Sequence, residues 1–314
     1  MSIAQRLADS ALINPGSDRV RSVAGLARRS ARSRAGRFLT EGPQCVREAL
    51  RAHLGEFDAL VPAPRDGVID ALYISERALQ RHRDIDQLVE RVLQAEGSPR
   101  VFVRMVSDEV LAAMSDAEHP QGVLAVCRIP ELTWAQVAER RPRLVAVMCR
   151  VQDPGNAGTV LRAADAAGAD AVVLTAGSVD LHNPKVVRST AGSLFHLPVL
   201  TGLDPAELVG RPVSDAAGGE LQVLAADGYG ALDLDELQDA SAAGREAAVE
   251  LARPTAWLFG NEAQGLSEQE KALASHRVAV PLHGAAESLN VGTAATLCLY
   301  ASARAQRRTA EGAA

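Results

Sequence analysis

RLVAVMCRVQDPGNAGTVLRAADAAG, residues 143–168, combines an apolar run, a tight turn and a helical segment. The run RLVAVMCRV is suited to a strand that is buried on both faces, as the strands of parallel sheets are. An Asp-Pro-Gly turn at 153–155 follows, and Asn156, a favoured N-cap residue, predicts the start of a helix over 156–168. A strand that leads directly into a helix is the repeating unit of a parallel α/β sheet.

The same alternation of strand and helix continues to the carboxyl end of the chain. A parallel sheet with covering helices is therefore expected over 143–314. We expect strands at 171–175, 196–200, 221–227, 255–260 and 276–282, and helices around 183–194, from Ser267 onward and over 290–305.

The amino-terminal part also alternates strands and helices and predicts a second, smaller α/β domain. We place this domain at 1–130, followed by a linker with a short helix at 131–142. Its expected strands lie at 37–40, 71–75, 101–106 and 122–129.

Composition narrows the class of protein. The 314 residues have room for two domains, and a hydrophobic content of 47% is enough for a core. No apolar run reaches the roughly 18 residues that a membrane span needs, and the first residues lack the apolar region of a signal peptide, so we expect a cytoplasmic protein without a membrane partner. The four cysteines show no C-x-x-C spacing and the histidines no H-x-x-x-H spacing, which favours reduced core thiols over a redox or metal site.

The net charge of −6 is unevenly distributed along the chain. Residues 1–104 contain 17 Arg and no Lys against 13 Asp and Glu, and within 19–51 nine Arg face only two acids. A basic lobe on an acidic body attracts an anionic polymer, and Arg suits bidentate phosphate contacts and stacking on bases. The alternative is a solvated helix face in a sequence that prefers Arg over Lys. Under the first interpretation, nucleic-acid contacts are assigned to Arg28, Arg29, Arg32, Arg34 and Arg37.

A glycine loop, WLFGNEAQGLS at 257–267, follows another of the expected strands. It has the Gly-x-x-x-x-Gly outline of a phosphate-binding P-loop, but the Lys-Ser/Thr that completes that motif is missing, and Glu262 lies inside the loop. Since no G-x-G-x-x-G follows an early strand either, the sequence argues against a P-loop NTPase and a Rossmann dehydrogenase. Ser267 and Glu270 have the spacing of a capping box, which predicts where the next helix begins.

Two further loops carry polar residues whose role the residues alone leave open. Arg162 lies near the start of a helix, where a cation opposes the helix dipole, so either a salt bridge to Asp165 or a function accounts for it. Ser288 and Asn290 precede the helix expected over 290–305, and capping of that helix is an alternative to a functional role. All three loops follow strands, and ligands bind outside the carboxyl ends of strands in open α/β sheets.

Taken together, NAGTVLRAA (156–164), LFGNEAQGL (258–266) and PLHGAAESLNV (281–291) resemble, in this order, the three motifs of the SpoU family of RNA ribose 2′-O-methyltransferases. These enzymes belong to the SPOUT superfamily of trefoil-knotted α/β proteins. The resemblance covers the carboxy-terminal domain. The amino-terminal domain is similar to the family's substrate-binding domain through FLTEGPQCVREAL (38–50) and HPQGVLAV (119–126).

The resemblance implies S-adenosylmethionine as the cofactor, bound inside the knot mainly by backbone groups, and RNA as the substrate. It also implies a homodimer, with the helix over 290–305 as the expected interface. Ribosomal RNA, in particular 23S rRNA, fits the long amino-terminal domain better than tRNA, which is the alternative substrate; a non-catalytic RNA-binding protein is the alternative of another class. Carried over by position, the catalytic residues are Arg162, Asn156, Glu262, Ser288 and Asn290, and the cofactor-binding residues are Gly260, Val280, Leu282 and Leu289.

The chemistry implied for Arg162 concerns the proton of the ribose hydroxyl. Methyl transfer requires that oxygen, methyl carbon and sulfur lie in line and that the hydroxyl loses its proton. Because a guanidinium stays protonated, Arg is a poor base. We therefore expect Arg162 to stabilise the developing alkoxide and to hold the adjacent phosphate. Asn156 and Glu262 would fix the geometry of this arginine, while Ser288 and Asn290 would orient the nucleotide and the loop.

Overall fold

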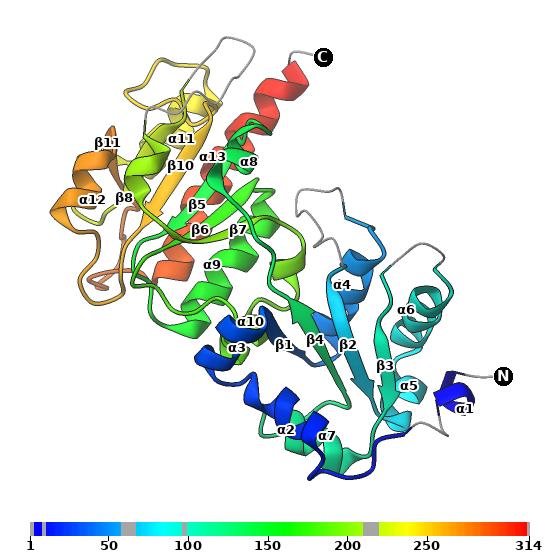
Figure 1. The fold of residues 1–314 in the computed structure, drawn as a ribbon. Coiled ribbons are helices and arrows are strands. Elements are labelled where there is room, and N and C mark those ends of the chain that lie inside the picture. Colours follow the sequence, from blue (N-terminus) through cyan, green and yellow to red (C-terminus); the bar gives the residue numbers. More distant parts are fainter. Residues whose placement is uncertain (1–2, 8–10, 58–66, 96–98, 210–219, 313–314) are drawn as a thin grey trace. The chain divides into compact units, whose positions relative to one another are not determined.

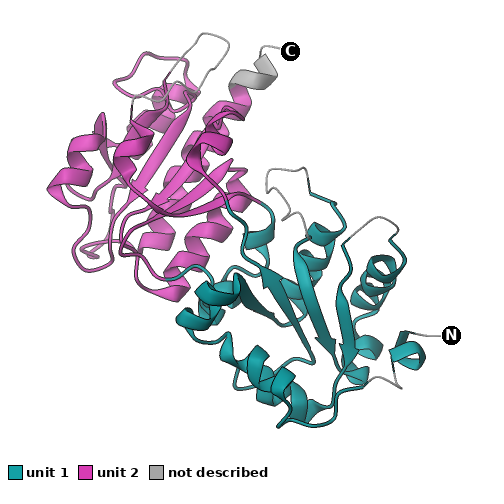
Figure 2. Cartoon of the chain, viewed as in Figure 1, with its two compact units in different colours: residues 1–131, 180–196 teal, residues 132–179, 197–314 magenta. Residues whose placement is uncertain are grey.

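The computed structural model describes residues 3–7, 11–57, 67–95, 99–209 and 220–312 (Figure 1). The chain separates into two compact units (Figure 2). Unit 1 comprises Met1–Glu131 and Asp180–His196, and unit 2 comprises Leu132–Val179 and Leu197–Ala314. The expected domain limits coincide with this division only in part, because 180–196 packs with unit 1.

Unit 1 is built on a four-stranded sheet with the order β1-β4-β2-β3. Strand β4 is antiparallel to both of its neighbours, β1 and β2, whereas β2 and β3 are parallel. The strands are β1 (Arg37–Glu41), β2 (Ile69–Ile74), β3 (Phe102–Met105) and β4 (Val123–Arg128), in agreement with the four expected strands. The helices are α1 (Ile3–Leu7), α2 (Asp18–Gly25), α3 (Arg29–Ala35), α4 (Pro43–His53), α5 (Glu76–Arg81), α6 (Arg83–Gln94), α7 (Asp108–Met114) and α10 (Pro184–Ser189).

The segment 180–196 belongs to unit 1 through specific side-chain contacts. The ring of His182 lies 4.7 Å from that of Phe38 on β1, and burial lowers the pKa of His182 to about 4. Arg188, on α10, forms a salt bridge with the buried carboxylate of Glu41. A neutral, half-buried imidazole and a partly buried ion pair hold this segment against β1.

Unit 2 contains a seven-stranded sheet with the order β7-β6-β5-β10-β8-β11-β9, in which every pair is parallel. The expected parallel sheet with covering helices is therefore confirmed. The strands are β5 (Leu144–Met148), β6 (Ala171–Thr175), β7 (Val199–Leu203), β8 (Gln222–Ala226), β9 (Leu232–Asp233), β10 (Thr255–Phe259) and β11 (His276–Ala279). The helices are α8 (Trp134–Ala138), α9 (Pro154–Ala167), α11 (Leu234–Ala242), α12 (Glu268–Leu273) and α13 (Val291–Gly312).

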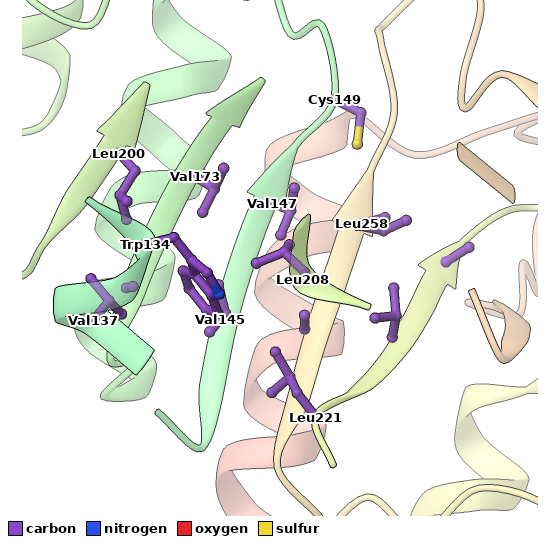
Figure 3. Packing of buried hydrophobic residues seen from close by; sticks show 14 of the residues in the cluster. Trp134, Val137, Val145, Val147, Cys149, Val173, Leu200, Leu208, Leu221 and Leu258 are labelled. Atoms are coloured by element: carbon purple, nitrogen blue, oxygen red, sulfur yellow. The ribbon is translucent and has the colours of Figure 1, made fainter. Parts of the chain in front are cut away.

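The two faces of this sheet are covered by different elements. On one face, Trp134 of α8 and Leu208 pack on Val145, Val147 and other side chains of the central strands (Figure 3). The segment expected to be a linker, 131–142, thus contributes a buried side chain to the core of unit 2. On the other face, α13 lies along α9 and contacts β5 and β10, and the indole Nε1 of the buried Trp257 donates a hydrogen bond to Ser302 Oγ over 2.9 Å (Figure 1).

Several element limits differ from the expected ones for physical reasons. Strand β7 begins at Val199, three residues after the expected start, because His196 still caps a short 3-10 helix at Ser193–Phe195 and Pro198 has no N–H to donate. Helix α11 was not anticipated: its N-cap Asp233 and the acids of its first turn also suit a loop. Helix α13 continues to Gly312, well beyond the expected end at residue 305.

None of the described helices is both long and apolar enough to cross a membrane. The described residues also contain no cluster of three or more His, Cys, Asp or Glu side chains that could hold a metal ion. All four cysteines are buried as free thiols, and burial raises the pKa of Cys127 to about 12. These thiols pack in the core and are poor nucleophiles.

Candidate active site

Three loops of unit 2 meet at the carboxyl ends of its central strands. The first joins β5 to α9, the second joins β10 to α12, and the third joins β11 to α13. Strand β5 pairs directly with β10, so the first two loops emerge side by side from the sheet. This edge is where open parallel sheets place their ligands.

Glu262 of the second loop is bound by the first loop. Its Oε1 accepts hydrogen bonds from Asn156 Nδ2 over 3.1 Å and from the backbone N–H of Asp153 over 3.2 Å. Its Oε2 accepts a hydrogen bond from the backbone N–H of Gln152 over 3.3 Å. Burial would raise the pKa of this carboxyl group, but the hydrogen bonds from Asn156, Asp153 and Gln152 outweigh burial and hold the pKa below its usual value. Glu262 is thus a fixed, ionised acceptor.

Asn156 does not cap α9, contrary to the expectation from sequence. The helix begins at Pro154, and Asp153 is the N-cap, whose side chain accepts a hydrogen bond from the backbone N–H of Asn156 over 2.8 Å. Pro154 favours this start because its fixed φ suits the first helical position, where no N–H is needed. The Asn156 side chain is therefore free to make contacts with the other two loops.

The third loop joins the same network through Asn290. Its Nδ2 donates a hydrogen bond to Asn156 Oδ1 over 2.8 Å, and its Oδ1 accepts one from the backbone N–H of Gly292 over 2.8 Å. Asn290 therefore caps α13, as one alternative predicted, and also binds the first loop. Glu262, Asn156 and Asn290 form a continuous chain of hydrogen bonds through all three motifs.

Arg150 is a residue of the site that sequence reasoning missed. It lies between β5 and α9, and its guanidinium forms a bidentate salt bridge with the buried Glu270 of α12. Nε lies 3.0 Å from Oε1, and an Nη lies 2.7 Å from Oε2. The same guanidinium donates a hydrogen bond to the backbone carbonyl of Gly265 over 3.2 Å. Its backbone φ of 57° is uncommon for a residue other than glycine and often marks a functional site. No sequence pattern signals this role, because the partner is 120 residues away.

The second loop is folded back tightly on itself. The N–H groups of Asn261 and Gly265 each donate a hydrogen bond to the other residue's carbonyl, over 3.1 and 2.8 Å. A Cβ at Gly260 would lie 2.3 Å from the backbone of Gly265, so only glycine fits there. The predicted capping box is present, since Ser267 and Glu270 exchange hydrogen bonds at the start of α12. The loop is held in one conformation at both of its ends.

Arg162 and Ser288 stand apart from this network. Arg162 is exposed on α9, and no salt bridge of its guanidinium is found within the described residues. Ser288 is exposed in the third loop. Their side chains are thus accessible to a substrate at the same edge of the sheet.

The residues assigned to the cofactor surround the same loops. Gly260 follows β10 directly, Val280 follows β11 directly, and Leu289 precedes Asn290. Leu282 is 39% exposed, so its apolar side chain is accessible to a ligand. Neither 260–266 nor the loop that contains the other three residues carries a Lys or Arg. Apolar side chains beside backbone groups, without cations, fit an adenosyl group with a sulfonium better than they fit a phosphate.

The five arginines assigned to nucleic acid, all in unit 1, differ in their surroundings. Arg32 is 3% exposed and bonds to Asp180 and to the carbonyls of Leu26 and Ala27, so it is not available to a nucleic acid. The charge pattern of the sequence includes Arg32 in the basic segment but does not reveal that its side chain is buried. Arg37 is paired with Asp70 at 2.9 Å. The three exposed arginines of the set are Arg28, Arg29 and Arg34.

Comparison with known proteins agrees with this geometry. Residues 143–300 match the model of the SpoU rRNA Methylase family, and residues 17–125 match the MRM3-like substrate binding domain. The chain is 31% identical over 269 residues to the 23S rRNA (guanosine(2553)-2′-O)-methyltransferase RlmP of Bacillus subtilis. This match covers 86% of this chain and 89% of that protein. It is 32% identical over 203 residues to the 23S rRNA (uridine(2479)-2′-O)-methyltransferase of Streptomyces viridochromogenes, over 64% of this chain and 67% of that one.

A solved structure shows the same fold. The SpoU methyltransferase AviRb from Streptomyces viridochromogenes, in complex with the cofactor AdoMet, superposes with a TM-score of 0.72 and 27% identity, and the match covers 93% of this chain and 99% of that one. The match thus covers most of both units.

Proposed function

The chain belongs to the SpoU rRNA methylase family, and from this we propose that it transfers a methyl group from S-adenosylmethionine to a ribose 2′-hydroxyl of 23S rRNA. The observation that carries the proposal is the chain of hydrogen bonds through Glu262, Asn156 and Asn290, which joins all three motifs of the family. The two relatives named above are 23S rRNA enzymes, which favours ribosomal RNA over tRNA.

The side chains divide the work of the reaction between them. S-adenosylmethionine supplies the methyl group when it is bound. Glu262, held ionised by its donors, fixes Asn156, and Asn156 in turn fixes Asn290 at the start of α13. Arg162, exposed and without an ion pair in the described part of the chain, is free to hold a ribose oxygen and its adjacent phosphate. A guanidinium there stabilises negative charge on the oxygen as the proton leaves. Ser288 orients the nucleotide.

Val280, Leu282 and Leu289 would cover the apolar side of the cofactor, and the bent loop at Gly260 would offer backbone groups to its polar edge. The second loop is fixed by Arg150 and Glu270, so its backbone is preorganised for binding. These roles rest on the exposure of Leu282 and on the loop geometry.

Unit 1 would bind the RNA. Its match to a substrate-binding domain and its basic helix α3 support this role. Arg28, Arg29 and Arg34 are exposed and would contact phosphates, whereas Arg32 would hold α3 in place. The domains we propose are RNA-binding over 1–130 and methyltransferase over 143–314, joined by 131–142.

We further propose that the protein is a cytoplasmic homodimer in which α13 lies at the interface. Leu297 and Tyr300, both on α13, are 44% and 47% exposed, and large apolar side chains in this state suit a contact with a second copy. In such a dimer Arg162 of one copy can serve the cofactor of the other. A mixed dimer of Arg162→Ala and Glu262→Gln chains would then regain part of the activity that each variant lacks.

A trefoil knot in unit 2 is the remaining part of the proposal. It is supported by the way in which the third loop returns to the first loop through Asn290 and Asn156 before α13 packs along α9.

The test is transfer of labelled methyl from S-adenosylmethionine to purified 23S rRNA, 16S rRNA and tRNA. We expect label in 23S rRNA alone. Label in tRNA alone would replace the proposed substrate by the alternative one. No label in any RNA, with S-adenosylmethionine binding intact, would favour a non-catalytic RNA-binding protein.

A further inference from the structure

Two adjoining cavities lie in unit 1 away from the arginines of α3. One has a volume of about 220 Å³ and the other about 580 Å³. They share Leu111, His119, Pro120 and Gln121 as lining residues, so together they form one groove between the start of α4 and the loop that joins α7 to β4. A groove of this size can accept a nucleotide-sized ligand.

The groove carries cations that have no acidic partner. Arg77 and Arg81, both on α5, line it and are exposed, and neither forms a salt bridge with any described residue. Other arginines of this unit, such as Arg47, Arg51 and Arg91, are paired with acids. These two guanidinium groups outnumber the single carboxylate in the lining of the larger cavity, that of Asp108, so this part of the groove attracts an anionic ligand.

The lining of the groove also includes groups that can recognise a base. His119 and Gln121 are exposed on the loop before β4, and Gln44 is exposed at the start of α4. An imidazole ring can stack on a base, and a side-chain amide can donate and accept hydrogen bonds at a base edge. The combination of cations, a ring and amides suits an unpaired nucleotide.

The loop that carries these groups is held in place before any ligand binds. The buried carboxylate of Glu41 accepts hydrogen bonds from Ser115 Oγ over 3.0 Å and from the backbone N–H of Asp116 over 2.7 Å. At the other end of the loop, Gly122 has a φ of 87°, and its carbonyl accepts a hydrogen bond from the backbone N–H of Ser75 over 2.8 Å. A loop fixed at both ends loses little entropy on binding.

We propose that this groove binds an unpaired nucleotide of the RNA substrate, with the base against His119 and Gln121 and the flanking phosphates on Arg77 and Arg81. The inference rests on the proposed function for the identity of the ligand as RNA. It adds a second contact region to unit 1, one that distinguishes unpaired from paired RNA, because the bases of a duplex are not available to stack on His119. The exposed arginines of α3 would bind the phosphates of paired and unpaired RNA alike.

The test measures equilibrium binding of the full chain to a single-stranded oligoribonucleotide and to the same strand closed in a duplex, over a range of salt concentrations. The variants are Arg77→Ala/Arg81→Ala and His119→Ala, and the matched control is Arg100→Ala, an exposed arginine of unit 1 outside the groove. All of these residues are exposed, so thermal unfolding is expected to be unchanged.

The double arginine variant is expected to reduce the slope of log K against log salt by about 1.4, the value for two phosphate contacts with a single strand. His119→Ala is expected to weaken single-strand binding at least about fivefold while duplex binding stays unchanged. A 4-thiouridine in the strand should cross-link to the loop between α7 and β4. Unchanged affinity and slope in both variants would overturn the inference. So would a loss of binding to an acidic peptide in these variants while their binding of RNA stays unchanged.

These measurements use neither cofactor nor methyl transfer, which keeps the two proposals distinguishable. If the groove variants lose single-strand binding while the wild type methylates no RNA, the groove assignment stands and the enzymatic proposal falls. If the wild type methylates 23S rRNA while the groove variants bind and react as the wild type does, the groove assignment falls.

Discussion

Asn156 donates a hydrogen bond from Nδ2 to Glu262 Oε1 over 3.1 Å, and this contact places the first two motifs of the site in a fixed relation. The same amide accepts a hydrogen bond from Asn290 through its oxygen, which adds the third motif. Because an amide both donates and accepts, a single side chain can bind an acid on one side and another amide on the other. The geometry of this hydrogen-bond network therefore depends on the ionised state of Glu262.

Replacing Glu262 by Gln removes one of the two oxygens that receive the three N–H groups. Whichever way the new amide turns, its NH2 group meets a donor, and hydrogen bonds to a charged acceptor contribute about 1.5–3 kcal/mol. We expect kcat to fall roughly 10- to 100-fold and the unfolding free energy to fall by about 1–3 kcal/mol. Steady-state kinetics and urea unfolding measure both. Glu268→Gln, a neighbouring acid that is 90% exposed, is the control, and equal kcat in the two variants would refute this role.

Arg150 connects the end of β5 to the second loop, so its loss should affect cofactor binding more than chemistry. Arg150→Met leaves the carboxylate of Glu270 buried without its cation and releases the carbonyl of Gly265. We expect the dissociation constant for S-adenosylmethionine to rise about tenfold or more, with kcat at saturating cofactor within a few-fold of the wild type. Calorimetric titration measures the first quantity. The double variant Arg150→Met/Glu270→Met should recover part of the lost stability, since no unpaired charge then remains; unchanged affinity in the single variant would contradict the role.

The salt bridge of Glu270 also predicts a dependence of stability on pH. Burial would raise the pKa of Glu270, but its hydrogen bonds with Arg150 and Ser267 outweigh burial and lower the pKa from the usual 4.5. A lowered folded-state pKa contributes stability that is fully present above the unfolded value and is lost as pH falls through the folded value. The difference in unfolding free energy between wild type and Glu270→Gln should therefore be constant from neutral pH to about pH 5 and shrink below 4.5. Urea unfolding across this range checks it; a difference that grows in acid would contradict the assignment.

Arg32 and Arg34 lie on the same helix, α3, and should behave in opposite ways. Arg32→Ala leaves Asp180 without its partner, and breaking a buried ion pair costs about 3–5 kcal/mol of unfolding free energy. Arg34→Ala is a surface change and should alter stability by less than about 0.5 kcal/mol while it weakens RNA binding and its salt dependence. Chemical unfolding and RNA titrations of both variants test the pair. A destabilised Arg34→Ala, or a fully stable Arg32→Ala, would contradict the account.

Much of unit 2 could be predicted from sequence because its strands are short apolar runs that stand between clear turn residues. Strand β6 matches its expected limits, and the capping box at Ser267 is found where it was expected. The N-cap of α9 was misplaced because Asp153 and Asn156 are equally good cap residues, and only the position of Pro154 between them decides the start.

The parts that sequence could not predict depend on contacts between distant segments. The role of Arg150 depends on its positive φ in the turn after β5 and on its salt-bridge partner on α12. Arg32 carries the same positive charge as its exposed neighbours on α3. Only the packing of the segment 180–196 makes it a buried structural residue. Local patterns report which side chains are present, whereas the fold decides which of them meet.

The central claim is that the methyl group is placed on a ribose oxygen by a site that contains Arg162. The most direct measurement is a single-turnover reaction of wild type and Arg162→Ala with labelled S-adenosylmethionine and 23S rRNA, followed by alkaline hydrolysis, which leaves an uncut dinucleotide only at a 2′-O-methylated ribose. We predict label in one such dinucleotide for the wild type, a rate at least about 100-fold lower for Arg162→Ala, and equal cofactor affinity for both. Label in a mononucleotide, or an Arg162→Ala rate equal to that of the wild type, would contradict the account.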